Sequence, residues 1–371
     1  MTTHTVTQFT HTQARQEKIK LAPIFRWALM ATSIVFMARL VRDGWGDITE
    51  AVHMLATTKA NYVLAAVALE VVWTWCLAQV YRSALIAMGG QARHRDAVRV
   101  SMGAFTLSRI LPGGGAVGSV LAARELMALG NRGTVTISSM IISWWVSMTT
   151  LSSIVLAGVT AAVASDLIEP SYLIPPAAAL SAMILLGCGF VVAVRHPRAR
   201  ARLQAMFTKV LGQQGLTGSA TSSLDELETA VAGLQGGRRL GVVSWWAGAA
   251  WTFDAAALWV IFRAFGQNLP FGAMLVGYGL ANLLQALPEL TPGWLGVLET
   301  IMAVTYTAFG VPAGVAVVAV LSYRLLSYWL PVAAGLPSAI GILRRSGRRA
   351  PVAVGAEVSR GIGRPVSDLA V

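Results

Sequence analysis

Charged residues are scarce in this chain of 371 residues. Asp, Glu, Lys and Arg together make up 12% of it, about half of their share in an ordinary soluble domain. This shortage excludes a disordered protein, a coiled coil and an ordinary soluble enzyme. Apolar residues instead make up 55% of the chain. Since a spanning helix needs ~20 apolar residues, the composition indicates a polytopic all-α membrane protein with about ten membrane segments at most.

Cysteine and the common catalytic motifs are also scarce or missing. Cys76 and Cys188 stand far apart inside apolar runs, which argues against a disulfide framework, a zinc site and a thiol catalyst. The sequence contains no P-loop, no H-E-x-x-H, no G-x-S-x-G, no histidine pair at ligand spacing and no Asp-rich loop for a metal-bound sugar donor. Neither a metal nor a cofactor is therefore predicted.

Basic residues exceed acidic ones by 29 to 17, which gives a net charge of +12. They are spread over short loops, a pattern typical of cytoplasmic loops held against anionic lipid rather than of a nucleic-acid interface. No cleavable signal peptide is evident, and the first apolar run is interpreted as a retained anchor. The charge distribution predicts that both termini are cytoplasmic.

The apolar runs define the predicted organisation. A polar cytoplasmic N-terminus (1–23) precedes a transmembrane domain (24–345), and a disordered basic tail follows (346–371). Six long spans are predicted at 24–41, 61–88, 134–164, 172–194, 240–265 and 312–343, with a cytoplasmic insert at 195–239. Two further apolar segments, 96–130 and 271–310, are broken by Pro and Gly. The charges do not distinguish a re-entrant hairpin from a pair of thin spans in either segment.

The two broken segments are related by a shift of 180 residues. Pro112-Gly113 recurs as Pro292-Gly293, and Gly130 recurs as Gly310. Each half, 24–165 and 171–345, then reads as two spans, a broken hairpin and a third span. Because three crossings are an odd number, the second half is expected to be inverted in the membrane. In transporters built this way, the interrupted helices mark the substrate site.

Ionisable residues inside membrane segments are functional candidates, because each costs ~3 kcal/mol or more in lipid. We expect Arg109 and Glu289, equivalent under the shift, either to face each other or to serve as structural or interfacial charges. Arg324 needs an anionic partner, either a carboxylate such as Glu299 or a phosphate. Asp254 is a candidate for proton coupling or for a helix-to-helix hydrogen bond. The full candidate set is Glu70, Arg109, Arg124, Glu125, Asp254, Glu289, Glu299 and Arg324.

A glycine-rich stretch, Gly113 to Gly118, formally matches G-x-G-x-x-G. No strand precedes it, so a dinucleotide site is rejected. A helix that opens at such a break presents backbone N–H groups and a positive dipole end, which favours an anion such as a lipid phosphate. The alternative is a simple tight turn.

These motifs resemble the flippase-like family that includes the transmembrane part of lysylphosphatidylglycerol synthase. The resemblance covers most of 24–345. Three motifs carry it: Leu111-Pro112-Gly113-Gly114 followed by Arg124, then Pro292-Gly293 with Gly296 and Glu299, and finally Arg324 after Tyr323. The second motif usually has two glycines, whereas this chain has Gly293-Trp294.

The resemblance implies an inner-membrane protein that moves a phospholipid, an aminoacyl-lipid or a polyprenyl-phosphate-linked glycolipid between leaflets. The tail leaves no room for a soluble aminoacyltransferase domain, so aminoacylation is not expected. The alternatives are a lipid-modifying membrane enzyme and a scaffold for an envelope synthase. The predicted substrate-binding residues are Arg109, Pro112, Gly113, Gly114, Arg124, Pro292, Gly293, Glu299 and Arg324, and the predicted coupling or ion-pair residues are Asp254, Glu289 and Glu299.

Overall fold

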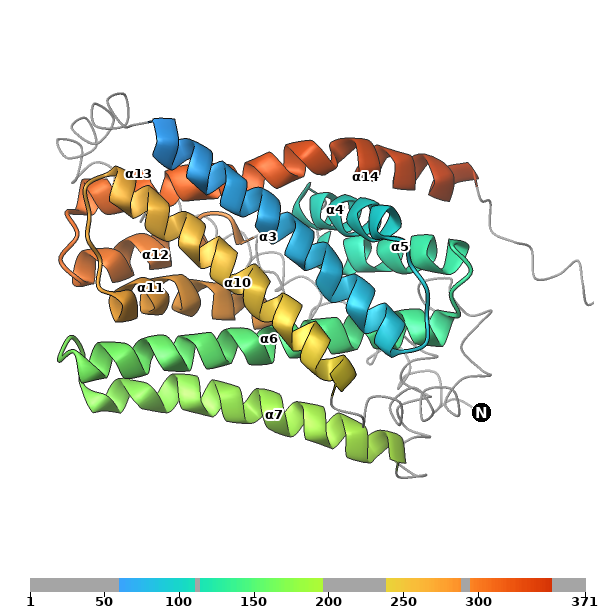
Figure 1. Ribbon diagram of the computed structural model, residues 1–371, viewed down its shortest axis with the longest axis horizontal. Coiled ribbons are helices and arrows are strands. Elements are labelled where there is room, and N and C mark those ends of the chain that lie inside the picture. Colours follow the sequence, from blue (N-terminus) through green and yellow to red (C-terminus); the bar gives the residue numbers. More distant parts are fainter. Residues whose placement is uncertain (1–59, 111–113, 196–237, 288–293, 349–371) are drawn as a thin grey trace, which may run out of the picture.

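Every regular element of the structure is helical within the residues it describes (Figure 1). The structure, a computed structural model, describes residues 60–110, 114–195, 238–287 and 294–348. The predicted N-terminus, the first span, most of the 195–239 insert and most of the 346–371 tail lie outside these ranges.

Four long helices coincide with predicted spans: α3 (Ala60–Ala87), α6 (Gly133–Ala164), α7 (Ile174–Arg195, after the short η1, Pro170–Leu173) and α10 (Arg238–Ala264). Among the described residues, four helical stretches are long and apolar enough to cross a membrane: Ala60–Ala87, Val135–Ala164, Pro170–Gly189 and Ala313–Arg345. Helix α10 is not among them. A crossing by α10 and a total of six spans therefore stay predictions.

The last predicted span is one nearly continuous helical stretch with an irregular turn inside it. It consists of α13 (Ala313–Arg324), the π-helical turn η6 (Leu325–Trp329) and α14 (Leu330–Arg348). Isolated π-helical turns occur frequently at functional sites. This one begins directly after Arg324, the charged residue predicted to need a partner.

Both apolar segments predicted to be broken are indeed interrupted helices. The first consists of α4 (His94–Ile110) and α5 (Gly114–Ala128). The second consists of α11 (Phe271–Leu283), the short η4 (Leu284–Ala286) and α12 (Val297–Ala308). In Figure 1 the two pairs lie toward opposite ends of the long axis, with α3 and α10 crossing in front of the space between them.

Each broken segment packs against a long helix that is distant in sequence. Helix α4 packs on α14, α11 packs on α6, and α3 packs on α10. Glycines allow the first two contacts to be close: a Cβ at Gly335 would lie 2.1 Å from Thr106 Oγ1, and one at Gly272 would lie 2.5 Å from the Ala162 backbone nitrogen. Small residues of this kind bring membrane helices together.

The two broken segments also leave their second helix by the same turn. Gly130 and Gly310 both have a left-handed backbone, with φ of 93° and 89°. The amide of Gly130 donates to Met127 O, and that of the next residue donates to Leu126 O. The corresponding donors after α12 bond Thr307 O and Tyr306 O, again 180 residues later. Glycine is favoured at such a helix end because it has no Cβ.

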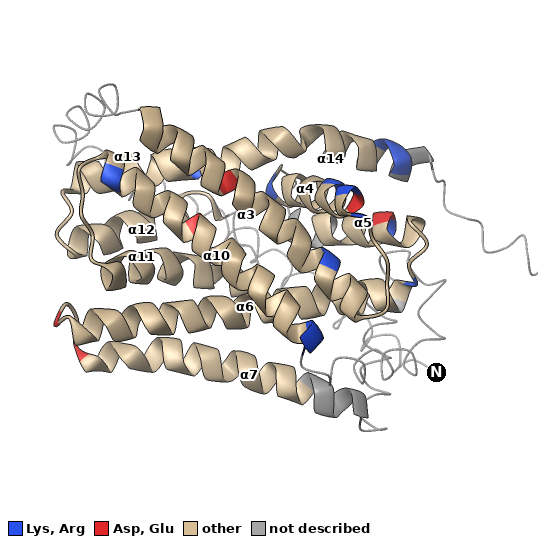
Figure 2. Cartoon of the chain, viewed as in Figure 1, with Lys and Arg blue, Asp and Glu red and all other residues tan. Residues whose placement is uncertain are grey.

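The exterior of the molecule is apolar along its long helices. Large side chains that include Ile174, Leu185 and Trp245 are each at least 70% exposed. Figure 2 shows few charged residues along α6 and α7 and more toward the end of the molecule formed by α4, α5 and the end of α14. An exposed apolar surface of this extent is typical of a lipid-facing protein, and the four long apolar helical stretches are consistent with a multi-pass membrane protein.

Candidate functional site

A buried ion pair joins the second broken segment to the last long helix. Arg324 Nε donates to Glu299 Oε1 over 2.6 Å, and the two residues are only 7% and 4% exposed. The carboxylate partner predicted for Arg324 is therefore confirmed. In this low-dielectric setting the contact holds α12 and α13 together, and removing either partner would leave a buried unpaired charge.

Glu299 is positioned by the start of α12. Its Oε2 accepts a hydrogen bond from the backbone N–H of Gly296 over 2.7 Å, while Oε1 meets Arg324. A carboxylate in the first helical turn satisfies a free amide and complements the positive end of the helix dipole. The glutamate thus fixes the local helix start and the distant arginine at once.

The residue before this turn departs from the family motif in an informative way. Trp294 is buried and has φ of 57°, in the left-handed region that glycine favours. The backbone there therefore keeps the conformation suited to a second glycine although a tryptophan occupies it. An L-residue in this conformation costs roughly 1–2 kcal/mol, and the buried indole N–H has no hydrogen-bond partner among the described residues.

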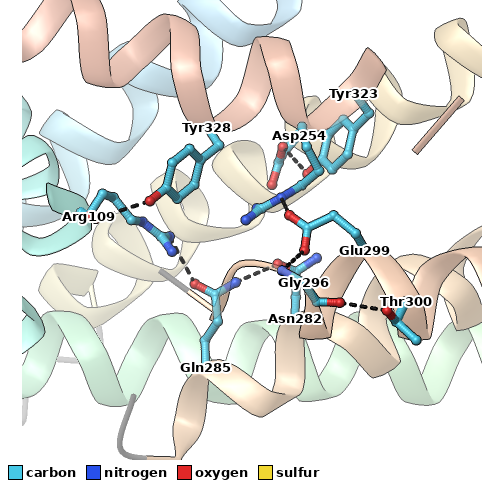
Figure 3. Close-up of polar contacts among 10 residues, drawn as sticks. Arg109, Asp254, Asn282, Gln285, Gly296, Glu299, Thr300, Tyr323 and Tyr328 are labelled. Atoms are coloured by element: carbon cyan, nitrogen blue, oxygen red, sulfur yellow. Dashed lines mark hydrogen bonds and ion pairs between the residues drawn. The ribbon is translucent and has the colours of Figure 1, made fainter. Parts of the chain in front are cut away.

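The two broken segments meet where their inner ends approach each other. Arg109, near the end of α4, donates from Nη2 to Gln285 Oε1 of η4 over 3.4 Å. Gln285 Nε2 in turn donates to Asn282 Oδ1 over 2.5 Å. Figure 3 shows this row of side chains leading from Arg109 toward Gly296 and Glu299.

Tyr328 of the π-helical turn connects the two arginines. Its ring lies beneath both guanidinium groups, 5.4 Å from that of Arg109 and 4.9 Å from that of Arg324. Its hydroxyl donates to the Arg109 backbone carbonyl over 3.1 Å. The aromatic face stabilises both cations electrostatically. One tyrosine therefore ties α4 to the irregular turn that follows Arg324.

Asp254 occupies a second buried polar centre on α10. Its two oxygens accept hydrogen bonds of 2.7 Å each, one from the Tyr278 hydroxyl and one from the Tyr323 hydroxyl. The predicted alternative of helix-to-helix hydrogen bonding is confirmed, since α10 is bonded here to α11 and α13. Glu70 of α3 is the carboxyl neighbour of Asp254.

Glu70, Arg109, Asp254, Glu299 and Arg324 are the predicted residues that the structure brings to these centres. Arg124 is exposed on α5, whereas its neighbour Glu125 is buried and accepts a hydrogen bond from Arg345 Nε over 3.1 Å. Gly114 is the first residue of α5. The other candidates lie outside the described residues: Pro112, Gly113, Glu289, Pro292 and Gly293.

Sequence reasoning missed most of the neutral polar residues of the site. Asn282 and Gln285, two amides at the end of an otherwise apolar helix, were a usable signal. Tyr278 and Tyr328 were not, because a tyrosine in an apolar run is equally typical of core packing. The described residues contain no group of three or more His, Cys, Asp or Glu that could hold a metal ion. Guanidinium groups beside side-chain amides in an apolar setting are donors of the kind that bind an anion.

Comparison with known proteins agrees with these features. Residues 25–335 match the family described as the lysylphosphatidylglycerol synthase TM region. A UPF0104 membrane protein of Methanothermobacter thermautotrophicus is 36% identical over 85 residues, which cover 23% of this chain and 25% of that protein. A UPF0104 membrane protein of Methanocaldococcus jannaschii is 32% identical over 83 residues, 22% of this chain and 24% of its own length. The chain thus covers about a quarter of these relatives. The family match extends over most of the chain, which therefore belongs to the family of the lysylphosphatidylglycerol synthase TM region.

Proposed function

We propose that this protein moves a lipid with a phosphate-bearing headgroup between the leaflets of the cytoplasmic membrane. The single observation that carries the proposal is the convergence of the partly buried Arg109 and the buried Arg324 on one tyrosine ring, where two interrupted helices meet. Charged residues inside membrane segments are expensive to maintain and mark transport pathways more often than anchors.

An inverted repeat is part of this proposal. Two similar turns 180 residues apart, at Gly130 and Gly310, support it. The reciprocal packing of α4 on α14 and of α11 on α6 supports it as well. In a repeat of this kind the broken segments enter from opposite sides and their inner ends enclose the substrate. The contact between Arg109 and Gln285 is where those ends meet.

The chemistry follows from the arginines. A guanidinium group has five N–H donors in a planar fork that matches two phosphate oxygens. The Glu299 contact uses the Nε–H of Arg324, and the Gln285 contact uses Nη2 of Arg109. In our proposal the headgroup phosphate draws both arginines toward itself while the acyl chains stay in lipid. Glu299 restores the ion pair when the lipid leaves.

The proposal includes membrane sidedness and partners. Both termini would be cytoplasmic, as the distribution of basic residues predicts. The expected partner is the lipid itself, and a lipid synthase or another envelope protein is a further candidate. We propose a transporter rather than an enzyme, because the described polar centres hold ion pairs and hydrogen bonds typical of binding.

Leaflet exchange of a fluorescent phosphatidylglycerol in reconstituted vesicles tests the proposal. The wild-type protein should accelerate exchange, and Arg324→Lys should reduce it strongly, because an ammonium keeps the charge but not the planar fork. Arg263→Gln is the control: this arginine is exposed and lies over the Trp259 ring at the end of α10, and its replacement should leave exchange unchanged.

Two results would contradict the proposal. Exchange no faster than in protein-free vesicles, with correctly folded protein, would favour a scaffold. A new lipid product after incubation of the pure protein with phospholipids would favour a membrane enzyme.

A further inference from the structure

Two carboxyl groups are buried together where α3 and α10 pack against each other. Glu70 is 1% exposed and Asp254 is 5% exposed, although both are acidic residues in the interior of an apolar helical body. Their charges lie close enough to interact electrostatically. Two ionised carboxylates repel each other, so a site that holds both favours the protonated form of one of them.

The two acids differ in the hydrogen-bond donors that reach them. Asp254 receives a hydroxyl group on each oxygen, from Tyr278 and Tyr323. Neither oxygen of Glu70 receives a hydrogen bond from an amide, a hydroxyl or a guanidinium group of the described residues. An ionised carboxylate in that position would be buried without a donor, which is strongly unfavourable. The two hydroxyl groups therefore favour the ionised form of Asp254, whereas no hydrogen bond from the described residues favours the ionised form of Glu70.

The charges facing this pair come from several elements. Helix α13 contributes Arg324, which interacts electrostatically with both acids. Helix α12 contributes Glu299, which pairs directly with Arg324. Beyond Arg324 lie Tyr328 of η6, whose ring contacts both arginines, and Arg109 of α4. Helix α6, packed against α3 and α10, has no ionisable side chain. Three carboxyl groups thus share the charge of Arg324, and a proton on Glu70 reduces the negative excess by one.

We propose that Glu70 and Asp254 form a proton-binding site that couples lipid movement to a pH gradient, with Glu70 as the group that takes up and releases the proton. The coupling rests on the proposed function, whereas the proton site itself does not. Uptake forms an O–H bond on Glu70 with a proton from water, and release returns it. With Glu70 neutral, the pull on Arg324 weakens and its guanidinium is available to a phosphate. With Glu70 ionised, Arg324 is held among carboxylates.

Infrared spectroscopy of the purified protein tests the site directly. At near-neutral pH the wild-type protein should show the C=O stretching band of a buried protonated carboxylic acid, and Glu70→Gln should lose it. Glu70→Asp should keep the band with a shifted pH midpoint, which guards against a variant that fails to fold. Glu125→Gln is the matched control, since Glu125 is equally buried but paired with Arg345, and it should retain the band.

Three results would overturn the proton site: no such band in the wild-type protein, an unchanged band in folded Glu70→Gln, or loss of the band on adding sodium at constant pH, which would identify a metal cation as the occupant. For coupling, vesicles with an imposed pH difference should show gradient-dependent lipid exchange with the wild-type protein and gradient-independent exchange with Glu70→Gln. An equal gradient response in both would refute coupling. Absence of wild-type exchange under all conditions would instead refute the proposed function and leave the infrared result standing.

Discussion

The inner ends of the two broken segments lie in the same region but are held there by different forces. On the second segment, Glu299 binds Arg324 at 2.6 Å and the Gly296 amide at 2.7 Å, so a short charged contact fixes the start of α12. On the first, Arg109 reaches Gln285 at 3.4 Å and lies over the rings of Phe105 and Tyr328. A long amide contact and two ring faces allow more displacement than a buried ion pair.

The long helices that pack on these two segments also differ, one being regular and the other containing an irregular turn. Helix α6 runs without interruption from Gly133 to Ala164, whereas the stretch from Ala313 to Arg348 contains the π-helical turn η6. The irregular turn directly follows Arg324 and carries Tyr328, which contacts Arg109. Arg324, held by an ion pair, and Arg109, held by weaker contacts, are therefore connected through Tyr328 of η6. A π-helical turn is a place where helix geometry can change.

The largest effect is expected from Arg324→Ala, which would remove the ion pair between Arg324 and Glu299. Removing one partner of a buried ion pair leaves Glu299 uncompensated and should cost about 3–5 kcal/mol of stability. Thermal unfolding in detergent measures this, and lipid exchange should be lost as well. The double variant Arg324→Met with Glu299→Met should recover much of the stability but none of the exchange. Recovered exchange in the double variant would contradict a role for the charge.

Steric changes at the close helix contacts should rank next. Gly272→Leu on α11 and Gly335→Leu on α14 would push each broken segment off its long helix, since even a Cβ would lie 2.5 Å or less from its neighbour. Overpacking of this kind should destabilise each variant by about 1–3 kcal/mol. Gly189→Leu on α7, where nothing lies within 4 Å, is the control. Similar losses at 272 and 335 would support equivalent packing of the two segments, and a loss at only one would argue against it.

Arg109→Gln, at the end of α4, should reduce lipid exchange much more than stability. Because Arg109 is only partly buried and meets Gln285 over 3.4 Å, the unfolding temperature should change less than in Arg324→Ala. Lipid exchange should fall about tenfold or more, equivalent to ~1.4 kcal/mol of lost phosphate binding. An unfolding change as large as that of Arg324→Ala would show that both arginines are structural anchors.

The smallest effect is expected from Glu125→Gln. The Arg345 side chain that meets Glu125 is 38% exposed, and a half-exposed ion pair contributes at most about 1 kcal/mol. Both the unfolding temperature and lipid exchange should stay close to wild-type values. A strong loss of exchange would move this pair from the periphery into the transport pathway.

The helical framework followed well from the sequence, and the reason is physical. Long apolar runs bounded by loops predict helix ends to within a few residues, as for α3 and α6. Pro and Gly in the same pattern predicted both interruptions. The π-helical turn had no such signal, because no proline or glycine stands between Arg324 and Trp329.

The site was predictable only where a charge stood in an apolar run. Glu299 was one of the two partners expected for Arg324, the other being a phosphate, because a buried arginine requires an anion. Asn282, Gln285 and Tyr328 act through their position in three dimensions, which depends on how α4, η4 and η6 meet. Glu70 and Asp254 were both candidates from the sequence. Their proximity was not predictable, because it depends on the packing of α3 on α10.

Photochemical cross-linking tests the central claim most directly. A phospholipid with a photoreactive headgroup, incorporated into vesicles with the wild-type protein and activated by light, should leave adducts on peptides that contain Arg109, Gln285 or Glu299. Excess phosphatidylglycerol should compete for these adducts, and Arg324→Lys should weaken them. Adducts confined to the exposed face of α7, with none near the inner ends of the two broken segments, would contradict a lipid site there.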